Sequence, residues 1–183
     1  MSEKHCKFFC NEKKDIVKES MIGLSLSNQD LLYYPDHNFI ISKYYISHSE
    51  KVRLICGGGA GHEPAHASFV GQGLLSCVVS GDIFASPSVQ NIVKAIEEVY
   101  SDAGVILIVK NYTGDIINFS SAMQVFKRQN KKIDMVIVDD DISLTNLNEE
   151  STSKFNKRRG LCGTVLLYKI LGYLSEKNYK FED

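Results

Sequence analysis

Four short apolar segments recur along the chain after residue 51 and predict buried strands. Both faces of each segment are apolar and β-branched residues are frequent, which is typical of strands covered on both sides. The segments are "VRLIC" (residues 52–56), "LLSCVV" (74–79), "GVILIV" (104–109) and "MVIV" (135–138).

Segments with helical periodicity lie between and after these strands. Residues 86–102 carry Ile92, Ala95, Ile96 and Val99 on one face, with Ser86 as the expected N-cap, and residues 115–131 and 163–179 show similar apolar faces. Alternating strands and helices predict an α/β fold, with a mostly parallel sheet and helices on both faces.

The same pattern divides the chain in two. Residues 1–50 are expected to be an entry segment that packs on the main body, because they show one helical series around Met21 and then alternate aromatic and polar residues around Pro35. Residues 51–183 are expected to form the α/β lobe. Within it, residues 145–157 are polar and without periodicity, which predicts a solvated loop.

Ligands of parallel sheets bind at the carboxyl ends of the strands. This rule directs attention to residues 57–62, 81–84, 110–115 and 139–141. The adjacent carboxylates Asp139–Asp141 are read as solvated or helix-capping groups rather than as a cation site.

The sequence "HEPAH" (residues 62–66) matches the H-E-x-x-H pattern of zinc peptidases. That pattern needs a continuous helix between its histidines, and Pro64 is unsuited to a helix interior. Pro64 suits a first helical turn, so we expect His62 in a loop, His66 in the following helix, and no metal site. The P-loop and dinucleotide-binding patterns fail too, because the required lysine and last glycine are missing.

Four glycines in residues 57–61, followed by His62, predict a turn whose backbone approaches a small polar ligand. His66 is expected to pack in the core or behind the site. In "KNYTGD" (residues 110–115), Asp115 is either a helix N-cap or the proton acceptor for a ligand hydroxyl, and the residues alone leave both interpretations open.

Composition narrows the function classes. The chain has 183 residues, enough for one domain, with a formal net charge of −1, so neither a nucleic-acid partner nor a membrane is expected. Five cysteines without C-x-x-C spacing, and no apolar leader, predict a reducing, cytoplasmic setting. Cys6 and Cys10 beside His5 are read as incidental.

Four blocks, in order and in register, resemble the signature segments of the dihydroxyacetone (glycerone) kinases, above all the ATP-dependent animal and fungal type that includes the triokinase, which also forms cyclic FMN from FAD. The resemblance covers residues 51–177 and implies the first lobe of the family's substrate domain. The blocks are "GGGAGHEPAHASFVGQGLL", "GDIFASPS", "GVILIVKNYTGDIINF" and "KRRGLCGTVLLYKI".

The resemblance also implies a site and a mechanism. His62 and Asp115 are the implied catalytic pair, which orients and deprotonates the hydroxyl that attacks the γ-phosphate of ATP. The implied residues that bind dihydroxyacetone are Gly59, Ala60, Gly61, His62, Lys110 and Asp115. Ala60 departs from the family's usual serine, which removes a hydroxyl.

Other features of the family are not found in these 183 residues. Its substrate is also held covalently by a histidine of the second lobe, and no histidine follows His66. ATP and Mg²⁺ bind a separate helical domain, so neither is expected on this chain, which is expected not to phosphorylate dihydroxyacetone alone. The alternative is a non-catalytic sugar-binding or regulatory module. The family's substrate domains pair, so a homodimer is the implied assembly.

Overall fold

The computed structural model describes Phe9, residues 11–143 and residues 158–183. The chain begins with a short 3₁₀ helix and α1, continues through the hairpin β1 and β2, and then alternates strands and helices. The elements are η1 (Lys13–Asp15), α1 (Ile16–Ser27), β1 (Leu31–Tyr34), β2 (Phe39–Ser42), α2 (Lys43–Ile46), β3 (Arg53–Ala60), η2 (Ala67–Phe69), β4 (Cys77–Ile83), α3 (Val89–Val99), β5 (Val105–Lys110), α4 (Thr113–Lys127), β6 (Ile133–Val138) and α5 (Gly163–Glu176).

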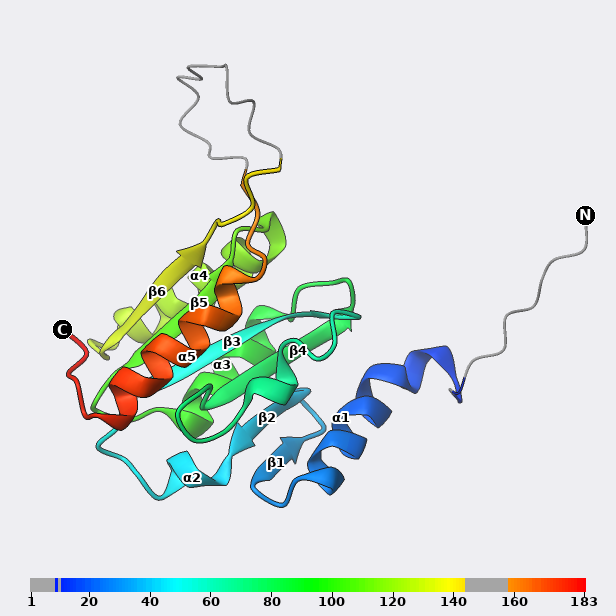
Figure 1. Ribbon diagram of the computed structural model, residues 1–183, viewed down its shortest axis with the longest axis horizontal. Helices are drawn as coiled ribbons and strands as arrows, with labels where there is room; N and C mark the ends of the chain where they lie inside the picture. Colours follow the sequence, from blue (N-terminus) through cyan, green and yellow to red (C-terminus); the bar gives the residue numbers. More distant parts are fainter. Residues whose placement is uncertain (1–8, 10, 144–157) are drawn as a thin grey trace, which may run out of the picture.

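One six-stranded sheet runs through the described part of the chain in the order β1-β2-β4-β3-β5-β6 (Figure 1). The four strands β4, β3, β5 and β6 are parallel, while β1 and β2 pair antiparallel with their neighbours. β3 lies between β4 and β5: the chain passes from β3 to β4 on one side and then crosses back to β5 on the other side of β3. This reversal opens a crevice at the carboxyl ends of β3 and β5, where ligands of such sheets bind.

Helices cover both faces of the sheet, as the apolar pattern predicts. Alternate residues of each strand point to opposite faces: Ile55 packs on one side against α3 and α4, whereas Leu54 and Cys56 pack on the other against α1 and α5. Figure 1 shows α5 crossing one face with α3 and α4 behind the sheet. The mostly parallel α/β fold is therefore confirmed.

β3 extends further toward the carboxyl edge of the sheet than its run of apolar residues indicates. The glycines Gly57, Gly58 and Gly59 were expected in a turn, but they belong to β3, and Gly57 is in register with Val79 of β4. β4 begins at Cys77 rather than at residue 74. Hydrophobicity marks the buried part of a strand, whereas these glycine-rich ends are strands because backbone pairing with β4 continues past the last bulky residue.

The described residues before position 50 do more than pack on the sheet. β1 and β2 form a hairpin around Pro35 and extend the sheet beyond β4, with Phe39 and Ile40 buried on opposite faces. α1 covers one face through Met21. The division at residue 50 remains a prediction that a stability measurement can test.

Two helix starts differ from the sequence prediction. α3 is capped by Ser88, whose Oγ accepts from the N–H of Asn91 at 3.2 Å, and not by Ser86, because the chain is still extended at Ser88. No α-helix begins at Pro64: His66 precedes only the 3₁₀ turn η2. The chain is extended again at Val70, the C-cap of η2, so the helical turn is limited to three residues.

None of the helices in residues 11–143 and 158–183 is long and apolar enough to cross a membrane. Cys6 and Cys10, and the polar loop expected at residues 145–157, lie outside the described residues.

Candidate active site

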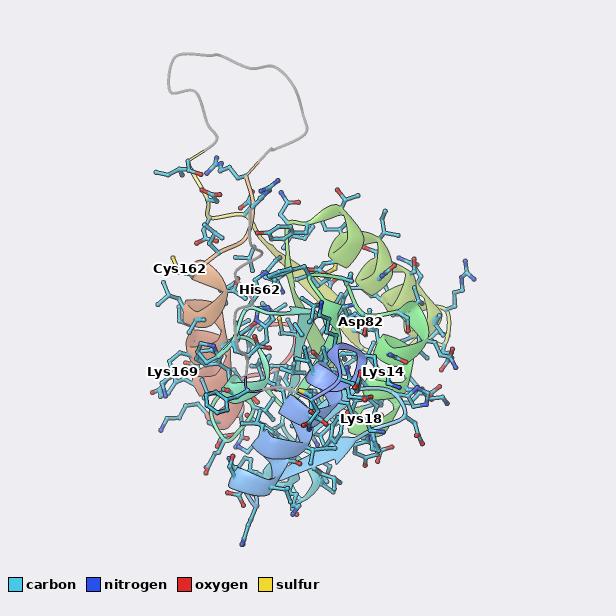
Figure 2. All side chains as sticks on the ribbon, turned by 90° about the vertical axis from the view of Figure 1, so that its right-hand side faces the viewer. Lys14, Lys18, His62, Asp82, Cys162 and Lys169 are labelled. Atoms are coloured by element: carbon cyan, nitrogen blue, oxygen red, sulfur yellow. The ribbon has the colours of Figure 1, made fainter. Side chains whose placement is uncertain are left out.

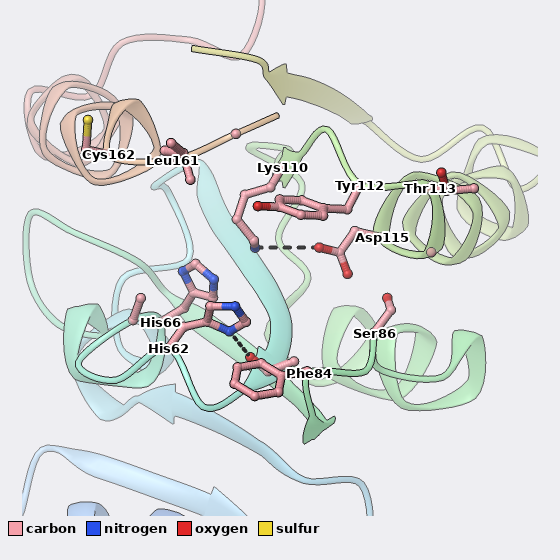
Figure 3. A pocket seen from close by; sticks show the side chains of 14 residues that line it. His62, His66, Phe84, Ser86, Lys110, Tyr112, Thr113, Asp115, Leu161 and Cys162 are labelled. Atoms are coloured by element: carbon pink, nitrogen blue, oxygen red, sulfur yellow. Dashed lines mark hydrogen bonds and ion pairs between the residues drawn. The ribbon is translucent and has the colours of Figure 1, made fainter. Parts of the chain in front are cut away.

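A pocket of about 560 Å³ opens at the carboxyl ends of β3 and β5 (Figure 3). Four segments form it: the end of β3 with the loop after it, the residues after β4, the end of β5 with the first turn of α4, and the residues before α5. The lining residues are Gly59, His62, Ala65, His66, Phe84, Ser86, Lys110, Tyr112, Thr113, Gly114, Asp115, Gly160, Leu161 and Cys162.

Glycines in β3 allow neighbouring groups to approach its backbone closely. A Cβ at Gly57 would lie 2.3 Å from the carbonyl oxygen of Val79, and one at Gly58 would lie 2.9 Å from the Nζ of Lys110. Any other side chain at Gly58 would therefore displace the ammonium group. Close approach of the backbone to its neighbours explains these glycines better than a turn does.

His62 presents one defined nitrogen to the pocket. Its Nδ1 lies 2.9 Å from the carbonyl oxygen of Gly59, which can only accept a hydrogen bond. Nδ1 is therefore a hydrogen-bond donor, and in the neutral imidazole Nε2 is the nitrogen with the free lone pair. The ring of Phe84 packs edge-on against the imidazole at 5.2 Å between ring centroids. His62 is thus oriented as a hydrogen-bond acceptor or base.

Lys110 and Asp115 form a buried charge pair beside His62. Lys110 Nζ donates to the carbonyl oxygen of Gly57 at 2.5 Å and lies 3.8 Å from Oδ2 of Asp115. Asp115 is 6% exposed and lies in the first turn of α4, where the helix dipole favours a carboxylate. The N-cap is Tyr112, so the capping interpretation of Asp115 is wrong and its carboxylate is directed to Lys110.

His66 lies behind His62, 9% exposed, with its Nδ1 2.7 Å from the hydroxyl of Tyr168 on α5. That hydroxyl donates to Sγ of Cys56 at 2.8 Å. Burial, followed by the positive charge of Lys110, lowers the pKa of His66 to about 3, so the imidazole is neutral near pH 7. Burial and Cys56 raise the pKa of Tyr168, which keeps its proton.

Asp140 holds the residues before α5 at the pocket. Its carboxylate accepts hydrogen bonds from the N–H groups of Leu161 at 2.6 Å and Gly163 at 2.8 Å, which fixes the start of α5 against the end of β6. Figure 2 shows Cys162 and His62 at the same end of the molecule, with Lys169 further along the outside of α5. The helix-capping interpretation of these carboxylates is confirmed for Asp140.

The sequence reasoning missed several lining residues. Phe84, 71% exposed with φ of 54°, lies against His62 and Gly61, and Ser86 has a buried hydroxyl with no hydrogen-bond partner. A signal existed for Ser86, since it follows a strand at the ligand edge, but it was read as a helix cap. Nothing in the sequence pattern indicates that residues 160–162 return to the pocket.

Ala60 and Gly61, two of the residues that the family resemblance implies in binding, do not line the pocket. The carbonyl oxygen of Ala60 accepts from the N–H of Phe84 at 2.9 Å, and the N–H of Gly61 donates to the carboxylate of Glu63. Gly59, His62, Lys110 and Asp115 do line it. Glu63 therefore stabilises the loop after β3.

Residues 11–143 and 158–183 bring together no group of three histidine, cysteine or carboxylate side chains that could hold a metal ion. The pocket's only close charge pair is Lys110 with Asp115, and the lysine occupies the place that a cation would take beside the carboxylate. The lining of this pocket therefore does not fit Mg²⁺.

Comparison with known proteins places this chain in a family. Residues 22–183 match the Dak1 domain. The dihydroxyacetone-binding subunit DhaK of a PTS-dependent dihydroxyacetone kinase from Lactococcus lactis is 41% identical over 94% of this chain and 50% of its own length. The triokinase/FMN cyclase of Mus musculus is 41% identical over 94% of this chain and 29% of its own. The chain thus spans half or less of these relatives.

Two solved structures share the fold. The dihydroxyacetone kinase of C. freundii, in complex with AMP-PNP and Mg²⁺, superposes with a TM-score of 0.83 at 38% identity, over 95% of this chain and 32% of that one. A dihydroxyacetone kinase operon co-activator, DhaQ, superposes with a TM-score of 0.81 at 36% identity, over 90% of this chain and 48% of its own. Both a kinase and a co-activator therefore carry this fold.

Proposed function

Because this chain belongs to the Dak1 domain family, we propose that it binds dihydroxyacetone in the pocket at the ends of β3 and β5, as part of the substrate-binding domain of an ATP-dependent dihydroxyacetone kinase. One observation carries the proposal: an oriented acceptor on His62 and the charge pair of Lys110 with Asp115 line the same pocket. Dihydroxyacetone has two hydroxyls and a ketone, which need both donors and acceptors.

The pocket offers both kinds of group. The ammonium of Lys110 donates to a ligand oxygen, while Nε2 of His62 and the carboxylate of Asp115 accept from a terminal hydroxyl. The carbonyl oxygen of Gly59 already accepts from His62, so Gly59 contributes backbone shape and fixes the imidazole. Ser86 adds a hydroxyl without a partner of its own.

The same groups serve phosphoryl transfer. An acceptor hydroxyl must lose its proton as its oxygen bonds to phosphorus, and a positioned base assists this step. Nε2 of His62 is the candidate base, because its tautomer is fixed with the lone pair toward the pocket. Asp115 holds the hydroxyl and the charge of Lys110 in place. The phosphoryl donor and Mg²⁺ are assigned to a part of the kinase outside the described residues.

Isothermal titration calorimetry of the 183-residue chain with dihydroxyacetone tests the proposal. We expect binding by the wild-type chain and an affinity about tenfold lower or worse for His62→Ala, because a hydrogen bond to the ligand is lost. His37→Ala is the matched control, since His37 bonds Asn91 of α3 and does not line the pocket.

Two outcomes of this titration contradict the proposal in different ways. Equal affinity of the wild-type chain and His62→Ala removes His62 from the site. An absence of binding by the folded wild-type chain removes dihydroxyacetone as the ligand.

A regulatory, non-catalytic sugar-binding module is the second candidate. The likeness to the co-activator DhaQ favours it, since that protein shares the fold at 36% identity. The transcript beyond Asp183 distinguishes the two candidates. An in-frame continuation into a second, histidine-bearing lobe and a helical domain supports the kinase, whereas a stop codon after Asp183 supports the module.

A further inference from the structure

The residues behind His62 form a chain of hydrogen bonds that runs from the pocket into the core. It joins His66 in the loop after β3, Tyr168 on α5 and Cys56 in β3. Tyr168 is 102 residues from His66 and 112 residues from Cys56 in the sequence. Tyr168 is fully buried, and among the described residues its hydroxyl bonds Cys56 and His66. His66, at one end of these hydrogen bonds, also lines the pocket.

The direction of these hydrogen bonds follows from the groups available. Tyr168 has one proton and gives it to Sγ of Cys56, and that thiol is placed 3.7 Å from the carbonyl oxygen of Gly57, which only accepts. The hydroxyl of Tyr168 must then accept from His66. Nδ1 of His66 is therefore the nitrogen that carries the proton.

The other nitrogen of His66 faces a cation. A Cβ built on Gly58 would meet Nζ of Lys110 at 2.9 Å and Nε2 of His66 at 3.5 Å, so both atoms border the same small space. A proton on Nε2 would set two donors against each other where little water enters. An unprotonated Nε2 instead offers a lone pair to an ammonium group whose three protons need acceptors.

We propose that His66 is a positioning residue of this site: Tyr168 holds it as the Nδ1–H tautomer, and its unprotonated Nε2 fixes the ammonium group of Lys110 for the ligand. That the ligand is dihydroxyacetone rests on the proposed function, whereas the tautomer of His66 does not depend on it. Lys110 from β5, His62 from the loop and Tyr168 from α5 face the imidazole, with Asp115 behind Lys110 and Cys56 behind Tyr168.

Nitrogen-15 NMR of the labelled 183-residue chain tests the tautomer. The signals of His66 are assigned by their loss in His66→Gln. We expect a protonated Nδ1 and an unprotonated Nε2 that do not titrate between about pH 5 and 8, where an ordinary histidine does. A proton on Nε2, or titration in that range, would overturn the inference.

Tyr168→Phe tests the positioning role, because it removes one hydroxyl and keeps the ring. Without that acceptor the proton of His66 is no longer confined to Nδ1, and we expect a mixed tautomer signal together with about tenfold weaker dihydroxyacetone binding. Tyr173→Phe, on the exposed side of the same helix, should change neither.

Circular dichroism checks that Tyr168→Phe is folded. Wild-type affinity in the folded variant overturns the positioning role. If the wild-type chain does not bind dihydroxyacetone, the proposed function fails, and the tautomer spectrum still decides whether Tyr168 fixes His66.

Discussion

Gly57 shows how tightly the sheet closes beneath the pocket. Its missing side chain leaves room for the carbonyl oxygen of Val79 and for the ring of Phe119, which would lie 2.3 Å and 3.0 Å from a Cβ. The carbonyl oxygen belongs to a neighbouring strand and cannot rotate away, so a methyl group here must push two strands apart.

We therefore expect Gly57→Ala to lower the free energy of unfolding by about 1–3 kcal/mol, the usual cost of overpacking. Urea denaturation measures it. Gly23→Ala is the control, because no atom lies within 4 Å of its Cβ and the residue is inside α1, where alanine is favoured by up to about 1 kcal/mol. Equal stability of Gly57→Ala and the wild-type chain would show that the strands can separate without cost.

At the scale of elements, α5 depends on a carboxylate from another part of the chain. Asp140 satisfies N–H groups at the start of this helix, and those hydrogen bonds, that of Leu161 first, hold the pKa of the Asp140 carboxyl below its ordinary value of 3.8. The folded state thus binds the proton less tightly than the unfolded state. Its stabilisation is complete above the unfolded-state pKa and is lost as the pH falls through the lower, folded-state pKa.

Asp140→Ala should lower the free energy of unfolding by about 1 kcal/mol near pH 7, as for other helix caps. The difference from the wild-type chain should shrink when the denaturation is repeated below pH 3.8, where the wild-type carboxylate begins to protonate. Asp140→Asn keeps one acceptor oxygen and should lose less. A stability difference that stays constant across this pH range would rule out the ionised cap.

Across the whole molecule, the described part of residues 1–50 shares both cores with the parallel sheet. Ile40 of β2 is fully buried with Leu54 and Val78 on one face, while Phe39 packs with Ile55 on the other. An entry segment that merely leaned on the lobe would not contribute to both cores, so we propose that these residues unfold together with the lobe.

Ile40→Ala should then destabilise the entire chain by about 2–5 kcal/mol in a single transition, because it leaves a cavity in the common core. Leu32→Ala, on the exposed side of β1, should cost about 1 kcal/mol or less. Circular dichroism for the helices and tyrosine fluorescence for the core should report the same midpoint. A separate early transition in Ile40→Ala would restore the division at residue 50.

The sequence by itself determined the class of fold and much of the pocket. Strand and helix periods are local, so the buried strands, the helices between them and the edge that carries His62, Lys110 and Asp115 could all be predicted from it. The same locality explains the errors at Ser86 and Pro64, where a proline was read as a helix start although the chain stays extended or turns.

Only the tertiary structure decided which distant groups meet. Backbone pairing with β4 made the glycines part of a strand, Asp140 returned residues 160–162 to the pocket, and Tyr168 reached His66 from a helix 102 residues away. Such contacts depend on how α5 packs across the sheet, and the hydrophobic periodicity of a single segment does not predict that packing. The acceptors at the pocket, His62 and Asp115, could therefore be predicted from the sequence, whereas the protonation state of His66 depends on the packing around it.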